Sequence, residues 1–150
     1  MDRKVVIIPT YNEKENIEAI VRKVFSLEGE YNVLIIDDGS PDGTAAIVKK
    51  VQTEFPERLF LIERSGKLGL GTAYLTGFKW ALENGYDYIF EMDADFSHNP
   101  EDLPRLYKAC AECGGVAIGS RYCDGISVVN WPIGRILMSY FASIYVKTVL

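Results

Sequence analysis

Short apolar runs alternate with helical spacing along most of this chain. Runs of Val, Ile, Leu, Phe and Tyr have the length and composition of buried strands. Between them, apolar residues recur three and four positions apart, as on the inner face of an amphipathic helix. The predicted strands are 5–8, 33–36, 59–62, 88–90 and 116–119. Continuous apolar strands that alternate with helices predict an α/β fold with a mainly parallel sheet and helices on both faces.

Capping signals predict where several helices begin and end. Asn12 followed by Glu15 has the spacing of a capping box, for a helix that carries Ile17 and Val24 on its inner face. Ser40-Pro41 would place a proline at the first position of the second helix. Later helices are predicted from about Thr72 to Asn84-Gly85, from Asn99-Pro100 onward, and over 133–150.

Three predicted strands run into polar segments that contain carboxylates, at residues 9–13, 37–44 and 93–98. Because right-handed crossovers put the carboxyl ends of parallel strands along one edge, we expect these segments to lie together. Ligands of such sheets bind at that edge, and carboxylates there can hold a divalent cation. The arrangement predicts a metal-assisted nucleotide or phosphate site.

The two acidic pairs differ in how far turn chemistry explains them. If the strand pleat continued, Asp93 and Asp95 would point to opposite sides of the strand. One carboxylate would then face a cation and the other a ribose or a water. The alternative is that the two residues only cap a helix or lie in a solvated loop. Turn chemistry explains Asp42 as a helix cap, but it does not explain two adjacent carboxylates, Asp37 and Asp38, at the end of a strand. A carboxylate at that strand end could accept hydrogen bonds from a base or ribose. Tyr11 would supply a flat face for stacking on the base.

Three further features are less specific. The glycine-rich segment 66–71 matches neither a P-loop nor a dinucleotide-binding fingerprint, and is interpreted as a tight turn with close helix packing. His98, the only histidine, could be a ligand or a base, but a structural role before a helix cap is the simpler interpretation. Cys110 and Cys113 have the spacing of half a zinc site without a second pair, which favours reduced thiols.

Composition places these elements in one globular domain. With 48% hydrophobic and 25% charged residues, a chain of 150 residues can bury a real core. A net charge of −5 without a basic cluster argues against nucleic-acid binding, so an anionic ligand would need a metal or placed cations such as Arg121 and Arg135. No signal peptide is recognised, and the uncharged stretch 136–146 is too short to cross a bilayer. The last segment is apolar and stops without a cap, which predicts a truncated domain whose final helix is either core or membrane-interfacial.

Six motifs, taken in order, resemble those of the dolichyl-phosphate mannose synthases and their bacterial polyprenyl-phosphate relatives. They are PTYNE (9–13), DDGSPDGT (37–44), GLGTAY (69–74), MDADFSHNP (92–100), GSRY (119–122) and NWPIGR (130–135). The first two and Asp-x-Asp are shared by many related transferases, whereas the forms PDGT, GLGTA and DADxSH are much more specific to the polyprenyl-phosphate branch. The resemblance spans nearly the whole chain. It implies an inverting glycosyltransferase of A-type fold, in which residues 1–150 are a catalytic domain truncated at its C-terminal side.

The resemblance also implies roles for individual residues. The nucleoside of a sugar nucleotide would be held by Pro9, Tyr11, Glu13, Ile36 and Asp38. The ribose-diphosphate and a Mg or Mn ion would be contacted by Asp93, Ala94 and Asp95, with Asp95 as the principal metal ligand and Ser97 as a further one. Phosphates, including that of the acceptor, would be met by Arg121, Arg135 and Ser139. Asp95 with its metal and Arg121 would carry catalysis.

The implied reaction transfers mannose from GDP-mannose to a polyprenyl phosphate in one inverting displacement. An acceptor phosphate is already anionic, so the lack of an obvious catalytic base is expected. The implied partners are the nucleotide sugar and the lipid, at the cytoplasmic face of a membrane and without nucleic acid. The alternatives are a transferase using UDP-glucose or UDP-N-acetylhexosamine, and a nucleotide-sugar-binding fragment without turnover. A phosphate-binding response domain is disfavoured, because Ser120-Arg121 stands where it needs a lysine.

Overall fold

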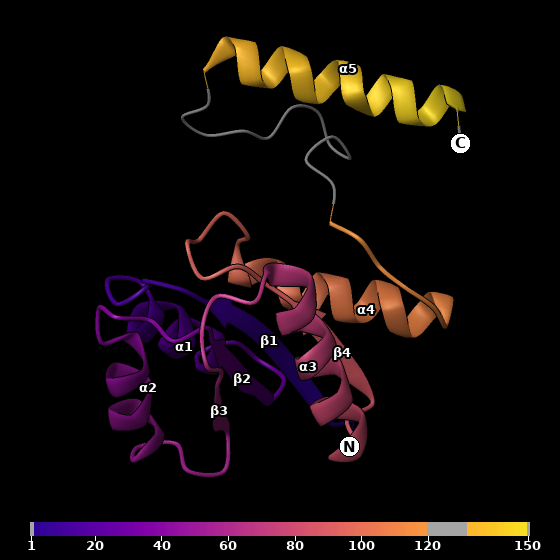
Figure 1. Cartoon of the computed structure of the whole chain (residues 1–150). Coiled ribbons are helices and arrows are strands. Elements are labelled where there is room, and N and C mark those ends of the chain that lie inside the picture. Colours follow the sequence, from indigo (N-terminus) through magenta and orange to yellow (C-terminus); the bar gives the residue numbers. More distant parts are fainter. Residues whose placement is uncertain (1, 120–131, 150) are drawn as a thin grey trace. The chain divides into compact units, whose positions relative to one another are not determined.

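The computed structural model describes residues 2–119 and 132–149. They belong to two compact units, residues 1–117 and 118–150. The first unit is built on a parallel sheet with the strand order β3-β2-β1-β4 (Figure 1). Its strands are β1 (Lys4–Thr10), β2 (Tyr31–Asp37), β3 (Leu59–Glu63) and β4 (Tyr88–Glu91). The parallel sheet and the first four predicted strands are therefore confirmed.

Helices cover both faces of this sheet. They are α1 (Ile17–Phe25), α2 (Thr44–Gln52), α3 (Leu70–Glu83) and α4 (Leu103–Cys113), the last preceded by a short 3-10 turn, η1 (Pro100–Asp102). Val6 and Ile8 of β1 pack in one core with α1, α2 and α4, while Val5 and Ile7 pack with α3 on the other face (Figure 1). Because successive side chains of a strand point to opposite faces, a sheet covered on both sides needs apolar residues at every position.

One glycine sets how closely α3 approaches the sheet. A Cβ added at Gly77 would lie 2.7 Å from Cγ2 of Ile7 in β1, so a larger residue would force either the Ile7 side chain or the helix to shift. The expectation of close helix packing within 66–71 is wrong in its location, since a Cβ at Gly66 or Gly71 would meet nothing within 4 Å. The turn itself is confirmed, because Gly69 has a φ of 97° immediately before α3.

Two predicted helix starts are wrong. Asn12 has a φ of 62°, a left-handed turn conformation rather than that of an N-cap, and α1 begins only at Ile17. The second helix begins at Thr44 with Gly43 as its N-cap, not at Ser40-Pro41. Asp42, expected to cap this helix, lies one residue before the N-cap and accepts a hydrogen bond from the Thr44 amide at 3.0 Å. In both cases tertiary contacts outweigh the local signal: the Asn12 amide donates to Oγ of Ser40 at 3.0 Å, which ties the two loops together.

Two other capping signals are confirmed. Gly85, after the C-terminus of α3, has a left-handed φ of 68°. The side chain of Asn99 accepts a hydrogen bond from the Glu101 amide at 3.1 Å at the start of η1.

The expected fifth strand is not formed. Residues 116–119 pair with no strand in the described part of the chain, and Val116 and Ile118 are more than 80% exposed. An apolar run becomes a strand only where a neighbouring edge accepts its backbone hydrogen bonds, which a local pattern does not specify. In the second unit the predicted final helix is confirmed as α5 (Ile133–Val149). Among the described helices, none is long and apolar enough to cross a membrane.

Candidate functional site at the carboxyl edge of the sheet

The strands of the sheet end close together at its carboxyl edge. The last residue of β1, Thr10, stands opposite Asp37 of β2, which stands opposite Glu63 of β3. β4 lies on the other side of β1, and the Met92 amide just beyond it donates to the Ile7 carbonyl at 3.1 Å. The chain passes from β1 to β2 on one side of β1 and later places β4 on its other side. Ligands of open parallel sheets bind outside the carboxyl ends of the strands, where the strand order reverses.

Most of the predicted site residues of the first unit lie along this edge. Pro9 and Ile36 are partners in the β1–β2 ladder, and Tyr11 and Glu13 follow β1. The residues that follow the other strands are Asp38 after β2 and Asp93, Ala94, Asp95 and Ser97 after β4. The side chain of Ile36 is fully buried against α3, so only its backbone could meet a ligand.

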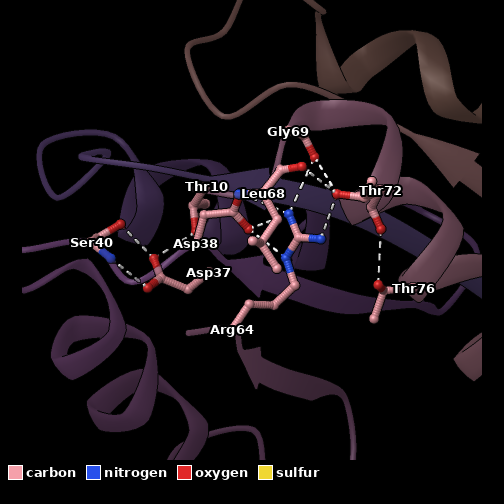
Figure 2. A network of polar contacts seen from close by, with 9 residues as sticks. All are labelled: Thr10, Asp37, Asp38, Ser40, Arg64, Leu68, Gly69, Thr72 and Thr76. Carbon is pink, nitrogen blue, oxygen red and sulfur yellow. Dashed lines mark hydrogen bonds and ion pairs between the residues drawn. The ribbon is translucent and has the colours of Figure 1, made fainter. Parts of the chain in front are cut away.

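Asp37 is held entirely by its own neighbours. Oγ1 of Thr10 donates to Oδ1 at 2.9 Å, and the Ser40 hydroxyl donates to the same oxygen at 2.6 Å (Figure 2). The Ser40 amide donates to Oδ2 at 2.9 Å. With 1% of its surface exposed, Asp37 fixes the turn after β2 and its carboxylate is not open to a ligand.

Asp38 is paired with an arginine that the sequence analysis did not identify. Arg64 follows β3, and its backbone amide donates to the Asp37 carbonyl at 2.8 Å. Its Nε donates to Oδ1 of Asp38 at 2.6 Å and its Nη2 donates to Oδ2 at 2.7 Å, a bidentate ion pair whose side chains are 9% and 8% exposed (Figure 2). No motif marks Arg64. Its only sequence signal is a charge directly after a buried strand.

The same arginine also holds the segment that leads into α3. Nη1 of Arg64 donates to Oγ1 of Thr72 at 2.8 Å, and Nη2 donates to the Gly69 carbonyl at 3.2 Å (Figure 2). The Leu68 amide donates to Oδ2 of Asp38 at 3.2 Å. We call residues 65–69 the glycine loop. It closes over the Asp38–Arg64 pair and is attached to both partners.

The loop after β1 is anchored to the loop after β2. The Glu13 amide donates to Oγ1 of Thr44, and the Lys14 amide donates to Oδ2 of Asp42 at 3.1 Å. Partial burial alone would raise the pKa of Asp42, but the hydrogen bonds from Thr44 and Lys14 outweigh it and hold that pKa below its ordinary value. Tyr11 stays exposed at the edge, with Nζ of Lys67 from the glycine loop 4.5 Å from its ring centroid.

The Asp93–Asp95 segment is a turn and not a continuation of the strand. β4 ends at Glu91, and Phe96 has a φ of 59°. The expectation that the two carboxylates alternate on a pleat is therefore wrong, because the pleat ends before them. Tyr74 of α3 donates to Oδ1 of Asp93 at 3.3 Å. Burial and the nearby charge of Asp93 raise the pKa of the Tyr74 hydroxyl, so it remains a donor.

His98 also orients Asp93. Its Nδ1 accepts a hydrogen bond from the Asp93 amide at 3.2 Å, and its Nε2 lies 3.8 Å from Oδ2 of Asp93. This contact agrees with the structural role expected for His98.

Asp95 lies on the exposed side of this turn. Hydrogen bonds from the side chain and the backbone of Ser97, the latter at 2.9 Å to Oδ1, hold the pKa of Asp95 below its ordinary value. The carboxylate is therefore ionised at neutral pH and accessible. Among the described residues no group of three or more His, Cys, Asp or Glu side chains is placed to hold a metal.

Three predicted residues lie elsewhere in the chain. Arg121 is outside the described residues, while Arg135 and Ser139 lie on α5 in the second unit. Cys110 and Cys113 of α4 take part in no disulfide within the described residues.

A cavity of about 340 Å³ lies at the opposite, amino end of the strands. It is lined by Asp2, Arg3, Lys4, Glu30, Asn32 and Arg58. Lys4 there lies over the rings of Tyr31 and Tyr107. This mixture of cations and acids is engaged in packing the strand starts, and it lies away from the edge where parallel sheets bind ligands.

Comparison with known families decides to which family the chain belongs. Residues 5–148 match the family model described as glycosyl transferase family 2. The chain belongs to that family.

Named relatives agree with this assignment. The chain is 47% identical over 148 residues to the polyprenol monophosphomannose synthase of Mycolicibacterium smegmatis, covering 99% of the chain and 56% of that protein. It is 43% identical over 148 residues to the undecaprenyl-phosphate mannosyltransferase of Micrococcus luteus (99% and 60%). It is 40% identical over 136 residues to the dolichol-phosphate mannosyltransferase of Pyrococcus furiosus (89% and 37%). The chain thus spans between 37% and 60% of the length of these relatives.

Solved structures confirm the A-type glycosyltransferase fold. The mannosyltransferase PcManGT from Pyrobaculum calidifontis, solved in complex with GDP-Man and Mn²⁺, matches with a TM-score of 0.57 and 29% identity over 62% of this chain and 27% of that one. TarS of S. aureus, residues 1–349, matches with a TM-score of 0.61 and 24% identity over 73% of this chain and 32% of that one. The second likeness concerns the fold alone.

Proposed function

We propose that this chain is the catalytic domain of a mannosyltransferase that uses GDP-mannose and a polyprenyl phosphate. The observation that carries the proposal is the accessible Asp-x-Asp turn after β4, with Asp95 ionised, beside β1, the strand that Tyr11 follows. Membership of family 2, and relatives whose names specify mannose and polyprenyl phosphates, support it.

In this proposal the nucleoside lies at the ends of β1 and β2. Tyr11 offers an exposed ring for stacking, and Pro9, Glu13 and the backbone of Ile36 border the same position. Arg64 occupies two of the acceptor positions of the Asp38 carboxylate. A remaining acceptor position of that carboxylate would accept a hydrogen bond from the base.

The diphosphate lies at the turn after β4, where Asp93, Ala94, Asp95 and Ser97 gather. The two carboxylates fit a Mg or Mn ion, because such ions are commonly held by one or two carboxylates together with substrate phosphates. Asp93 and Asp95 would hold the ion, with Ser97 beside them, and the bound ion would stabilise the charge of the departing GDP. Tyr74 holds the Asp93 carboxylate for that role, and His98 holds the backbone amide of the same residue.

The acceptor needs cations more than it needs a base. A phosphate monoester is an anion near neutral pH, so one of its oxygens can attack the anomeric carbon as the bond to the GDP oxygen breaks, which inverts the configuration. Arg121, Arg135 and Ser139 would position that phosphate. A guanidinium fork suits such an anion.

The lipid acceptor places the reaction at a membrane. Exposed apolar side chains on α5 include Leu137, Met138, Phe141 and Tyr145, which suit a peripheral contact with the interface on its cytoplasmic face. Flotation with liposomes tests this part separately. Full-length protein that remains wholly in the soluble fraction would contradict it.

The donor is tested by calorimetric titration with GDP-mannose, UDP-glucose and UDP-N-acetylglucosamine, each with Mn²⁺ and with EDTA. We expect metal-dependent binding of GDP-mannose alone, and release of GDP when a polyprenyl phosphate is added. Preference for a UDP sugar would shift the function to a related transferase. Binding without turnover in the presence of lipid acceptor would indicate a nucleotide-sugar-binding module.

A further inference from the structure

Arg64 is positioned by the sheet. Its backbone amide bonds to the Asp37 carbonyl in register with the β2–β3 ladder. All three nitrogen atoms of its guanidinium donate hydrogen bonds, to Asp38, to Thr72 and to the Gly69 carbonyl. A lysine at this position could not make the bidentate contact, because its ammonium is a point donor.

The hydrogen bonds to Asp38 leave it little freedom. A carboxylate has about four acceptor positions. Arg64 occupies two of them and the Leu68 amide a third, all from the side of the glycine loop. The acceptor capacity that remains therefore has one direction, set by the arginine. A base N–H placed by stacking on Tyr11 would meet a carboxylate that cannot rotate to follow it.

The glycine loop has its place fixed by the same contacts. Gly39, after Asp38, has a φ of 70°, and a Cβ on it would lie 3.4 Å from Cα of Gly66. The loop thus packs directly on the turn after β2, and its Lys67 stands against Tyr11. Loss of the arginine would release Asp38 and the neighbouring loop together.

We infer that Arg64 is a positioning residue that sets base selectivity in the donor site by fixing the direction of Asp38. The inference rests on the proposed function, since it needs a nucleoside at Tyr11 and Asp38. Guanine has N–H donors at N1 and N2 on its pairing edge, whereas adenine has none at either position. A carboxylate fixed toward this edge favours guanine, and one that can rotate discriminates less.

The test is calorimetric titration of the full chain with GDP and with ADP, in the presence of Mn²⁺. The variants are Arg64→Lys, Asp38→Asn and the two combined. Arg22→Lys is the matched control, because Arg22 makes an equally bidentate pair with Glu54 on the helical surface, at 2.9 and 2.8 Å. The fold of each variant is checked by near-UV circular dichroism.

We expect Arg64→Lys to weaken GDP binding about tenfold, the size typical of a lost charged hydrogen bond, with ADP binding nearly unchanged. Asp38→Asn should do the same, and the double variant should be no worse than Asp38→Asn, because the arginine acts through that carboxylate. Arg22→Lys should change neither. If Arg64→Lys does not fold, the neutral pair Asp38→Asn/Arg64→Gln replaces it and should lose the preference for GDP.

Two results overturn the inference alone: unchanged GDP binding in Arg64→Lys, or an equal loss for GDP and ADP, which would make Arg64 a scaffold of the loop. A wild-type protein that binds no guanine nucleotide overturns the proposed function, and the inference with it. Wild-type binding therefore separates the two failures.

Discussion

The two acidic pairs at the carboxyl edge are opposites in their surroundings. Asp37 and Asp38 are buried, and together they accept hydrogen bonds from Thr10, Ser40 and Arg64 (Figure 2). The pair after β4 is open: the Asp93 side chain is 40% exposed. Asp95 is exposed as well, and its hydrogen bonds come from within its own turn.

This difference separates two tasks within one site. A carboxylate with its own arginine is preorganised, so it can define a direction but has little charge left to attract a cation. An exposed carboxylate whose hydrogen bonds come from a hydroxyl or a backbone amide, as for Asp93 and Asp95, keeps its charge available for a divalent ion. Under the proposed function, the nucleoside side of the site is built before the donor arrives, and the diphosphate side is completed by the metal and donor.

The largest effect is expected from breaking the buried pair. Arg64→Ala leaves the Asp38 carboxylate without its charge partner at a position that is 8% exposed. We expect the free energy of unfolding in urea to fall by about 3 kcal/mol, the lower end of values for broken buried pairs.

The Arg22–Glu54 pair on the helical surface is the control for that loss. Its side chains are 40% and 45% exposed, so solvent screens the pair, and Arg22→Ala should cost much less. If Arg22→Ala and Arg64→Ala lowered the free energy of unfolding equally, burial at the carboxyl edge would not strengthen the Asp38–Arg64 ion pair.

The exposed pair should respond in the opposite way. Asp95→Ala should weaken Mn²⁺-dependent binding of GDP-mannose by about 100-fold or more, since even residues that only support metal ligands cost 10- to 100-fold. Its free energy of unfolding should stay within about 0.5 kcal/mol of wild type. Calorimetry and urea unfolding measure the two effects.

Asp87→Ala is the matched control for Asp95→Ala. Asp87 lies just before the amino end of β4, where it accepts a hydrogen bond from the Arg3 amide. It should leave donor binding unchanged. If Asp95→Ala bound the donor as tightly as wild type, the proposal that Asp95 holds the metal ion would be contradicted.

A smaller effect is expected from trimming the Asp37 network. Thr10→Val removes one donor to a buried carboxylate while the two from Ser40 remain. The expected loss of unfolding free energy is about 1 kcal/mol, with donor affinity changed by less than a factor of three. A loss of donor affinity as large as that of Asp95→Ala would contradict the division between the two pairs.

The smallest effect concerns Asp42, and it depends on pH. Because its pKa is lowered in the folded protein, its ionised form stabilises the fold above its ordinary pKa of 3.8, and this contribution disappears as pH falls through the folded value. Asp42→Ala should therefore lower the Tm slightly at pH 7. The difference from wild type should shrink below about pH 4. Thermal melts at both pH values test this, and a difference that persists in acid would assign the effect to packing instead of charge.

Local sequence determined the elements whose cause is local. The apolar runs of β1 to β4, the stripe of α1 and the caps at Asn99 and Gly85 follow from side-chain periodicity and backbone preference, and the structure confirms them. The collection of Tyr11, Asp38, Asp93 and Asp95 at one edge was also predictable, because parallel strands joined by helices must end on the same side.

Other features were decided only by the tertiary structure. Asn12 became a left-handed turn because Ser40 captures its amide, and residues 116–119 pair with no strand in the described part of the chain. The role of Arg64 depends on contacts with residues 26 positions before it and 8 after it. A charge after a strand looks the same in sequence whether it is solvated or buried. Only the packing of β2, β3 and α3 around it determines which carboxylate it neutralises, because electrostatic strength depends on burial and geometry that arise when the chain folds.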